Sequence, residues 1–260
     1  LTLNPGSDGS TIRGLVINGF NSTGGYAGNY DAAINIVSNN NHVECNFLGV
    51  QADGTTAAPN LRGVDINSVN NNVIGSDGTA KAYFARNLIS GNSYGQVDTR
   101  GNALSGNIIA GNYIGTDASG SVAMAGQGGI VEGVEINANP GPASGNYVGW
   151  NGVGNPALMR NVISGFTGST MAGVSMTVGA YANVVAGNYI GTDATGTKAI
   201  PNFFGIELGS NSSVYGNVVG NLGSQDPASA RNVIAGNSFA GVDINAANGT
   251  PVTPPTGHLT

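Results

Sequence analysis

The sequence has few charged residues and no basic cluster. Asp, Glu, Lys and Arg make up 8% of the 260 residues, with a net charge of −6, whereas roughly a quarter of a typical soluble domain is charged. Binding to nucleic acid through its phosphates requires clustered Lys and Arg, so we expect no nucleic-acid partner. The hydrophobic content of 40% excludes a disordered chain, which combines high charge with few apolar residues.

Cysteines, long apolar runs and helical patterns are also scarce. Cys45 is the only cysteine, which excludes an internal disulfide bond and a metal site built on thiolates. No run approaches the roughly 18 apolar residues of a membrane-spanning helix, so we expect no membrane span. The motifs of P-loop enzymes, serine hydrolases, zinc proteases and calcium-binding loops do not occur. We therefore predict no cofactor, apart from the calcium ion considered below.

Glycine and asparagine are abundant, with 44 and 35 residues spread evenly along the chain. The segment GNYIGTDATGTKAIPNFFGIEL, residues 187–208, returns at 111–136 and, more loosely, at 45–66. A second phrase alternates with it, at 71–92, 145–166 and 216–237. The two phrases together recur about every 72 residues, and such self-similarity is the signature of a repeat architecture.

Three kinds of short strand recur in a fixed order between Asn and Gly corners. The first reads G-[VI]-x-[IL], as at Gly63–Ile66, the second N-x-[VI]-x-G, as at Asn183–Gly187, and the third [RG]-N-[YVL]-I, as at Arg160–Gly165. Strands this short, with turn residues at the corners, fit a coil in which each turn adds one strand to each of three parallel sheets. We predict an all-β parallel solenoid of about seven rungs, a rung being one turn of the coil.

The repeats extend almost to the end of the sequence, so we predict a single solenoid domain over residues 1–247. A rung of roughly 30–40 residues exceeds the bare coil of about 22, so loops must project from it. They are expected after the third strand in one type of rung, and between the second and third strands in the other. Residues 248–260 are rich in Pro, which cannot donate to a β-ladder, and we predict a linker or an extended arm there.

Several segments carry a resemblance to a known class of repeats. GLVINGF (14–20), ARNLISGN (85–92), RNVISGF (160–166) and GNYIGTDATGT (187–197) look like the right-handed parallel β-helix repeats of large bacterial secreted or surface proteins, which often follow a CSLREA-type region. The resemblance implies a right-handed coil and an extracellular or cell-surface location. It implies no catalytic residues, because these repeats carry no agreed catalytic motif.

Matched positions predict what lies inside the coil. Inward residues such as Val64, Val134 and Val174 are expected to stack in columns, one residue per rung. Asn residues at turns tolerate unusual backbone geometry, and stacked Asn side chains form hydrogen-bond ladders. We expect this structural role for the corner residues Asn87, Asn112, Asn161, Asn188 and Asn232.

The outward position between the inward residues of the first strand carries a row of polar residues. We call it the acidic row, and it comprises Asn35, Asp65, Asp98, Glu135, Ser175, Glu207 and Asp243. The segment GQVDT departs from the pattern, which leaves the register of Asp98 open by one residue. With the register kept, Asp65, Asp98 and Glu135 lie on adjacent rungs about 5 Å apart. Such crowding raises carboxyl pKa values or attracts a hard cation such as Ca²⁺.

The acidic row has three interpretations: a solvated, solubilising face, a weak Ca²⁺ or glycan site, or the active site of a polysaccharide lyase or hydrolase. Asp65, Asp98 and Glu135 are the candidate catalytic and calcium-binding residues. The only two His residues, His42 and His258, are isolated from the row in the sequence.

The main functional hypothesis is a structural or adhesive extracellular β-helix, serving as a stalk or a self-assembling subunit of a bacterial surface structure. Open coil edges template further strand pairing, so a homo-oligomer or a filament formed by end-to-end contact is the expected partner. The alternatives are the carbohydrate-active enzyme and a phage-like receptor-binding spike.

Overall fold

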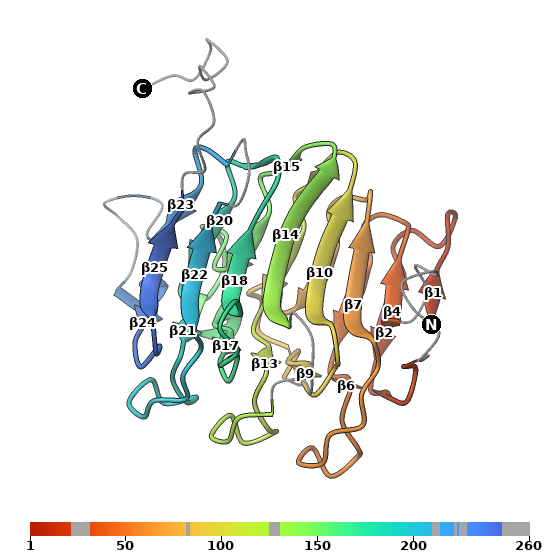
Figure 1. The fold of residues 1–260 in the computed structure, drawn as a ribbon. Coiled ribbons are helices and arrows are strands. Elements are labelled where there is room, and N and C mark those ends of the chain that lie inside the picture. Colours follow the sequence, from red (N-terminus) through yellow and green to blue (C-terminus); the bar gives the residue numbers. More distant parts are fainter. Residues whose placement is uncertain are drawn as a thin grey trace.

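The computed structural model describes residues 1–21, 32–81, 84–124, 131–209, 214–220, 223 and 228–245. The described chain winds as a coil whose named strands all pair in parallel (Figure 1). The predicted all-β parallel solenoid is therefore confirmed. The predicted arm at 248–260 lies outside the described residues.

The first sheet contains the G-[VI]-x-[IL] strands and has one strand more than the seven that the sequence predicted. Its strands, in spatial order, are β1 (Thr2–Leu3), β4 (Ala32–Ile36), β7 (Arg62–Asn67), β10 (Gly95–Gly101), β14 (Glu132–Pro140), β18 (Ala172–Met176), β22 (Phe204–Leu208) and β25 (Ala240–Ile244). The extra strand is β1, which lacks the Gly of the repeat. The predicted rung count thus differs slightly from the structure.

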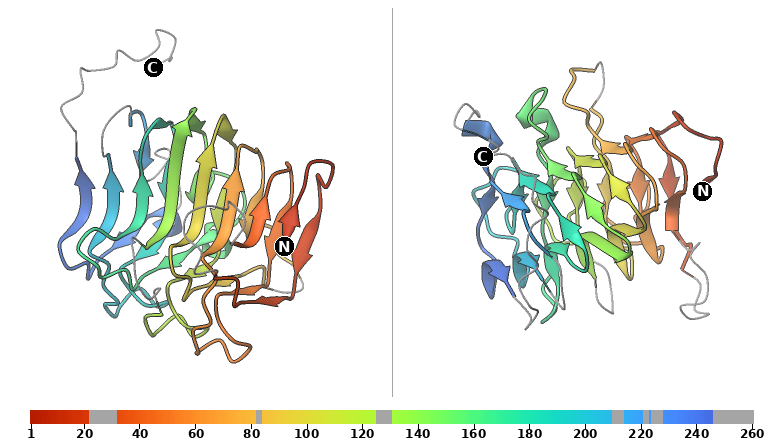
Figure 2. Two further views of the ribbon diagram at one scale, coloured as in Figure 1. Left: turned by 45° about the vertical axis from the view of Figure 1, so that its right-hand side comes forward. Right: turned by 90° about the horizontal axis from the view of Figure 1, so that it is seen from above.

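The second and third sheets have seven described strands each, and the views in Figure 2 show the sheets as separate walls of one coil. The second sheet contains β2 (Thr11–Arg13), β5 (His42–Glu44), β8 (Val73–Gly75), β12 (Ile108–Ala110), β16 (Tyr147–Gly149), β20 (Val184–Ala186) and β23 (Val218–Val219). The third contains β3 (Val16–Ile17), β6 (Phe47–Leu48), β9 (Leu88–Ile89), β13 (Tyr113–Ile114), β17 (Val162–Ile163), β21 (Tyr189–Ile190) and β24 (Val233–Ile234). A small fourth sheet, which was not predicted, contains β11 (Leu104–Ser105), β15 (Ala143–Ser144) and β19 (Ala180–Tyr181).

The coil is right-handed. In Figure 1 the first-sheet strands lie at the front and point upward while the chain advances from right to left, which is the right-handed sense. Each turn connects two parallel strands of one sheet through a crossover, and the natural twist of strands strongly favours right-handed crossovers.

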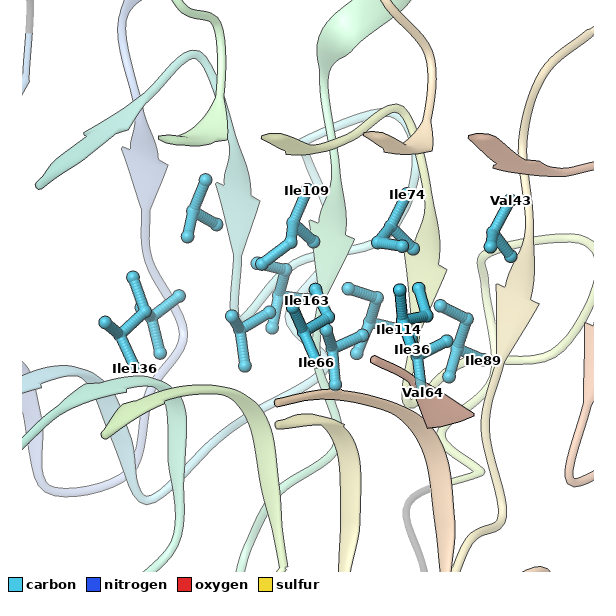
Figure 3. Packing of buried hydrophobic residues seen from close by; sticks show 14 of the residues in the cluster. Ile36, Val43, Val64, Ile66, Ile74, Ile89, Ile109, Ile114, Ile136 and Ile163 are labelled. Atoms are coloured by element: carbon cyan, nitrogen blue, oxygen red, sulfur yellow. The ribbon is translucent and has the colours of Figure 1, made fainter. Parts of the chain in front are cut away.

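The interior is a continuous stack of aliphatic side chains, as the column pattern predicted. Val64, Val97, Val134, Val174 and Ile206 are fully buried at matched positions of consecutive first-sheet strands. Figure 3 shows the side chains of the three sheets meeting between the walls. Burying one such side chain contributes about 1.5–3 kcal/mol, so the stack supplies a core for the whole coil.

Buried asparagines form a ladder at the corner between the second and third sheets. The side-chain amide Nδ2 donates to Oδ1 of the asparagine one rung on, at 2.9–3.2 Å, along Asn46, Asn87, Asn112, Asn161, Asn188 and Asn232. Each Nδ2 also donates to a buried carbonyl oxygen, as Asn112 does to Ile74 at 2.8 Å. The predicted structural role of these asparagines is confirmed.

A second ladder, not predicted as such, runs along the corner before the second sheet. Its amides are joined at 3.0–3.2 Å along Asn41, Asn72, Asn107, Asn146, Asn183 and Asn217. The two ladders flank the second sheet, whose strands have only two or three residues. The corners therefore align the rungs where the strands are too short to do so alone.

Loops project after the third-sheet strands β6, β13 and β21, as predicted. In these loops Asp117 and Asp193 accept hydrogen bonds from backbone N–H groups within the same turn, which is a typical turn-forming role of Asp. Loops two rungs apart touch: Ala118 N donates to Gly54 O, and Ala194 N donates to Gly120 O, both at 2.9 Å.

The intervening rungs carry their loops between the second and third sheets. The helix α1 (Pro156–Met159) and the 3₁₀ turn η1 (Ala228–Ala230) lie in two of these loops. Within the described ranges, no helix has the length and apolar character needed to cross a membrane.

The asparagine ladder predicts a large effect of a single amide. Asn112→Ala removes the partner of Asn87 Nδ2 and one of the donors to Ile74 O, and it leaves buried polar groups without partners. We expect the free energy of unfolding to fall by about 2–3 kcal/mol, measured by chemical denaturation. The control is Asn4→Ala at an exposed position, for which a change within about 0.5 kcal/mol is expected. Equal effects of the two substitutions would exclude a stabilising role of the ladder.

Candidate functional site: the acidic row

The acidic row is in register along the first sheet. Asn35 pairs with Asp65, Asp65 with Asp98, and Asp98 with Glu135. The pairing continues through Ser175 and Glu207 to Asp243. The candidate residues Asp65, Asp98 and Glu135 therefore lie on the adjacent strands β7, β10 and β14, about 4.8 Å apart. The register of Asp98, which the sequence left open, is the one that extends the row.

The middle of the row is buried, although it points away from the aliphatic core. Asp65 is fully buried, Asp98 is 3% exposed, and Asn35 and Ser175 are also buried. The interpretation as a solvated, solubilising face is therefore wrong for these residues. A buried carboxylate requires a counter-charge or a proton, and the row contains both arrangements.

Asp65 is neutralised by Arg100, which lies on the neighbouring strand β10. The guanidinium Nε donates to Asp65 Oδ1 at 2.6 Å, and a second guanidinium nitrogen donates to Oδ2. Such two-point contact is the strongest form of the Arg–carboxylate pair. Both carboxyl oxygens of Asp65 are thus engaged by one guanidinium.

Asp98 is paired with Arg62 in a gap that a glycine creates. Arg62 Nε lies 2.5 Å from Asp98 Oδ2, and its guanidinium carbon lies 4.5 Å from the centre of the Tyr94 ring. Gly95 pairs with Arg62 on one side and Glu132 on the other. A Cβ atom at Gly95 would lie 2.1 Å from Asp98 Oδ1, so the carboxylate occupies the space that a side chain at position 95 would fill.

Two further carboxyl groups, those of Glu132 and Glu135, lie close enough to Asp98 to interact with it electrostatically. Glu132 lies beside Gly95 on β14, and Glu135 pairs with Asp98. Glu135 Oε1 accepts a hydrogen bond from Asn137 Nδ2 at 2.9 Å. The Oε2 atom of Glu132 is inaccessible to solvent and has no hydrogen-bond partner in the part of the chain that the structure describes.

Burial and mutual repulsion shift these groups toward their protonated forms. Burial, together with the charge of Glu135, raises the pKa of Asp98 to about 7, although Arg62 acts in the opposite direction. Burial, followed by the charge of Glu135, raises the pKa of Glu132 well above its usual range. Burial also raises the pKa of Glu135. This acid cluster, Asp98, Glu132 and Glu135, therefore retains protons under conditions in which exposed carboxyl groups lose them.

The arrangement bears on the expected calcium site without testing it. No group of three His, Cys, Asp or Glu side chains in the described ranges is placed to hold a metal ion. Arg100 and Arg62 supply at Asp65 and Asp98 the positive charge that a bound cation would supply. Calcium binding by Asp65, Asp98 and Glu135 stays a prediction.

Arg62 and Glu132, which surround the row, were not identified from the sequence. Simple alternation places Arg62 and Glu132 on the same side as Val64 and Val134, inside the coil. The structure breaks this alternation at Gly63 and Gly133, where an added Cβ would run into the core side chains Ile89 and Ile163. The glycines therefore return Arg62 and Glu132 to the outer face, and Gly before the repeat valine was the available signal.

Comparisons with protein-family models, with curated proteins and with solved structures find no match to this chain. The parallel solenoid is shown by the structure, whereas membership of the CSLREA-type repeats stays a prediction.

The acid cluster predicts that stability falls as the pH rises from about 4 to about 7. Unfolded Asp98 loses its proton near pH 4, whereas the folded protein retains it until about pH 7. The folded state therefore binds more protons in this window, and the free energy of unfolding decreases as the pH rises. We expect a melting temperature several degrees higher at pH 5 than at pH 8.

Asp98→Asn mimics the protonated carboxyl group and should reduce this pH dependence between pH 5 and pH 8. The control is Asp53→Asn, because hydrogen bonds from Thr55 and Thr56 lower the pKa of Asp53 to about 2 and keep it ionised throughout the window. A pH dependence that Asp98→Asn leaves unchanged would contradict the assignment.

Proposed function

We propose that this chain is a structural β-solenoid of a bacterial extracellular surface assembly, a stalk element whose ends associate. The supporting observation is the exposure of core positions on the last described rung. Val242 and Ile244 on β25 are 41% and 73% exposed, whereas Val174 and Met176 at the same positions of β18 are fully buried. One further rung stacked on β25 would bury both side chains.

The opposite end of the described coil has the same character. Leu1, Leu15, Val16 and Phe20 are between 43% and 56% exposed, and they lie beside the first strands of the sheets, at the other end from β25 (Figure 1). Because all the strands stack in one direction, from β1 to β25, the two ends of the coil present different surfaces. Contact of one end with the other in a second copy is therefore head-to-tail, and it repeats into a filament.

The interior of the coil also suits a stalk. The amide ladders and the aliphatic columns run through every rung between the ends, so each rung is held by its neighbours along the whole length. In such a stack, stability is the sum of contacts between neighbouring rungs. The extracellular location and the adhesive role rest on the resemblance of the repeats to those of bacterial surface proteins.

End-to-end association can be tested by light scattering as a function of protein concentration. We expect the average mass of the unaltered chain to rise with concentration, and Val242→Lys/Ile244→Lys to remain monomeric because two buried charges oppose stacking. The matched control is Val122→Lys/Val153→Lys, which alters exposed valines in loops away from the ends and should associate like the unaltered chain. A strict monomer at millimolar concentration, or equal association of all three proteins, would contradict the proposal.

A carbohydrate-active enzyme is the second candidate, and the acid cluster is the observation that favours it. Asp98, with a pKa raised to about 7, pairs with Glu135, whose pKa is also raised. A carboxylic acid that retains its proton beside a second carboxyl group is the arrangement used for acid–base cleavage of glycosidic bonds. The receptor-binding spike has no comparable support and stays a prediction.

The enzymatic alternative predicts cleavage of a polysaccharide that depends on two residues. Neutral and acidic polysaccharides, with and without Ca²⁺, would be assayed for new reducing ends and for the unsaturated products of elimination. Asp98→Asn and Glu135→Gln should each lower turnover by at least 100-fold, whereas Asp243→Asn, in the same column at the end of the coil, should not. Absence of turnover on all substrates, or full activity of both variants, would exclude this function.

A further inference from the structure

A cavity of about 280 Å³ lies outside the coil, at the corner between the second and third sheets. On one side it is lined by residues 76, 79–81 and 84–86, which lie between β8 and β9, and on the other by residues 157 and 158 of α1. The rung between them turns tightly at Gly111 and carries no loop there. The alternation of loops therefore leaves a notch two rungs wide, which we call the Arg86 notch.

The next notch along the coil has the same construction but is filled. Trp150 follows β16 as Ser76 follows β8, and their N–H groups donate to equivalent carbonyl oxygens, Ala186 O and Ala110 O, both at 2.8 Å. The Trp150 side chain packs with Met159 and Ala230 in a buried cluster. Ser76 lines the Arg86 notch, so the cavity lies where the second notch has an indole ring.

The guanidinium groups of the two notches also differ. Arg160 donates to Gly187 O at 3.2 Å and to Ser229 O at 2.7 Å, and its guanidinium carbon lies 4.4 Å from the centre of the Tyr189 ring. Arg160 thus bridges the two sides of the second notch through its hydrogen bonds.

Arg86 makes the same contact with an aromatic ring as Arg160, but it lacks the hydrogen bonds to carbonyl oxygens. Its guanidinium carbon lies 4.0 Å from the centre of the Tyr113 ring and 6.0 Å from that of Phe84. It makes no hydrogen bond or ion pair with any described residue, although Gly111 and Leu158, which match Gly187 and Ser229 in the repeat, line the same cavity. A guanidinium with five donors therefore remains available at the notch.

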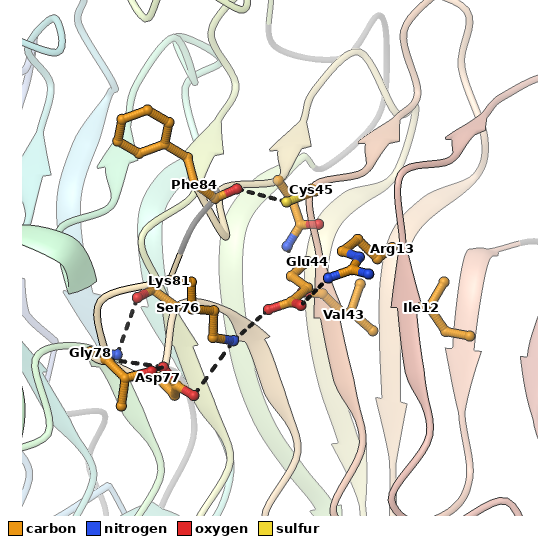
Figure 4. A network of polar contacts seen from close by, with 12 residues as sticks. Ile12, Arg13, Val43, Glu44, Cys45, Ser76, Asp77, Gly78, Lys81 and Phe84 are labelled. Atoms are coloured by element: carbon orange, nitrogen blue, oxygen red, sulfur yellow. Dashed lines mark hydrogen bonds and ion pairs between the residues drawn. The ribbon is translucent and has the colours of Figure 1, made fainter.

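A second cation is fixed in the wall. Lys81 lines the cavity, and its Nζ atom lies 2.7 Å from Glu44 Oε2 and 3.5 Å from Asp77 Oδ2 (Figure 4). Among the described residues, the lining contains two cations and no acidic side chain, in a chain with only eight Lys and Arg. The side chain of Phe84 is 79% exposed at the rim, and Leu158 contributes an apolar wall.

We propose that the Arg86 notch binds a small organic oxyanion. The carboxylate or sulfate group of the ligand is bound by Arg86, because a planar guanidinium matches the two oxygens of such a group. The carbon skeleton of the ligand lies against Leu158 and Phe84. A sugar acid and an aromatic acid share this chemistry. The site is independent of the proposed stalk function and lies away from the coil ends.

The test uses sodium glucuronate and sodium benzoate as organic probes, glucose and benzyl alcohol as their neutral counterparts, and sodium sulfate as the inorganic probe. Binding to the full chain is measured by titration calorimetry and by saturation-transfer NMR. We expect at least one organic acid to bind at least 10-fold more tightly than its neutral counterpart. A preference for glucuronate identifies a sugar acid, and a preference for benzoate identifies an aromatic acid.

Arg86→Gln should weaken binding at least 10-fold, and Ser76→Trp, which places an indole where the second notch has one, should abolish it. Arg231→Gln removes the same charge from the aligned position outside the cavity and should bind like the unaltered chain, and melting temperatures verify that each variant is folded. Three outcomes would overturn the proposal: no binding of either acid, equal binding by the folded Arg86→Gln and Ser76→Trp variants, or equal affinity for sulfate and both organic acids.

Discussion

The contact between buried asparagine amides on successive rungs is the interaction on which the rest of the structure depends. Because the strands of the second and third sheets have only two or three residues, backbone pairing alone fixes their alignment weakly. An amide that donates both to the next asparagine and to a carbonyl oxygen of the corner defines the rung spacing and the register together. The aliphatic columns then supply the free energy of the stack, and the ladders determine which side chains meet.

The same register creates an electrostatic problem on the first sheet. A repeat that places one residue type at the same position of every rung stacks like charges about 4.8 Å apart. Two features reduce this repulsion. Arg100 and Arg62 form ion pairs with Asp65 and Asp98, and the raised pKa values in the acid cluster favour protonated carboxyl groups. The buried acids are therefore a consequence of strict stacking, and their unusual protonation follows from the fold before any function is assigned.

The sequence was a good guide to what repeats and a poor guide to what does not. The columns through Val64 and Val134 and the ladder through Asn112 were predictable, because each depends on one residue type recurring once per rung. Arg62 and Glu132 were not, because Gly63 and Gly133 break the alternation of inward and outward side chains. Burial of Asp98 was also hidden, since it depends on the shape of neighbouring segments and on the gap at Gly95. The Arg86 notch depends on a difference between repeats, Ser76 in place of Trp150, and a pattern defined by what the repeats share does not contain it.

The contact between loops two rungs apart limits how a coil of this kind can lengthen. Ala118 is bonded to Gly54, and Ala194 to Gly120, across a rung that carries no loop at that corner. Adding or removing a single rung between two of these loops would change their separation and break the hydrogen bonds that join them. Growth or loss by duplication in pairs of rungs keeps these contacts, and it changes the length of the rod in steps of roughly 10 Å. The structural repeat is consequently a pair of rungs that differ in the position of their loops.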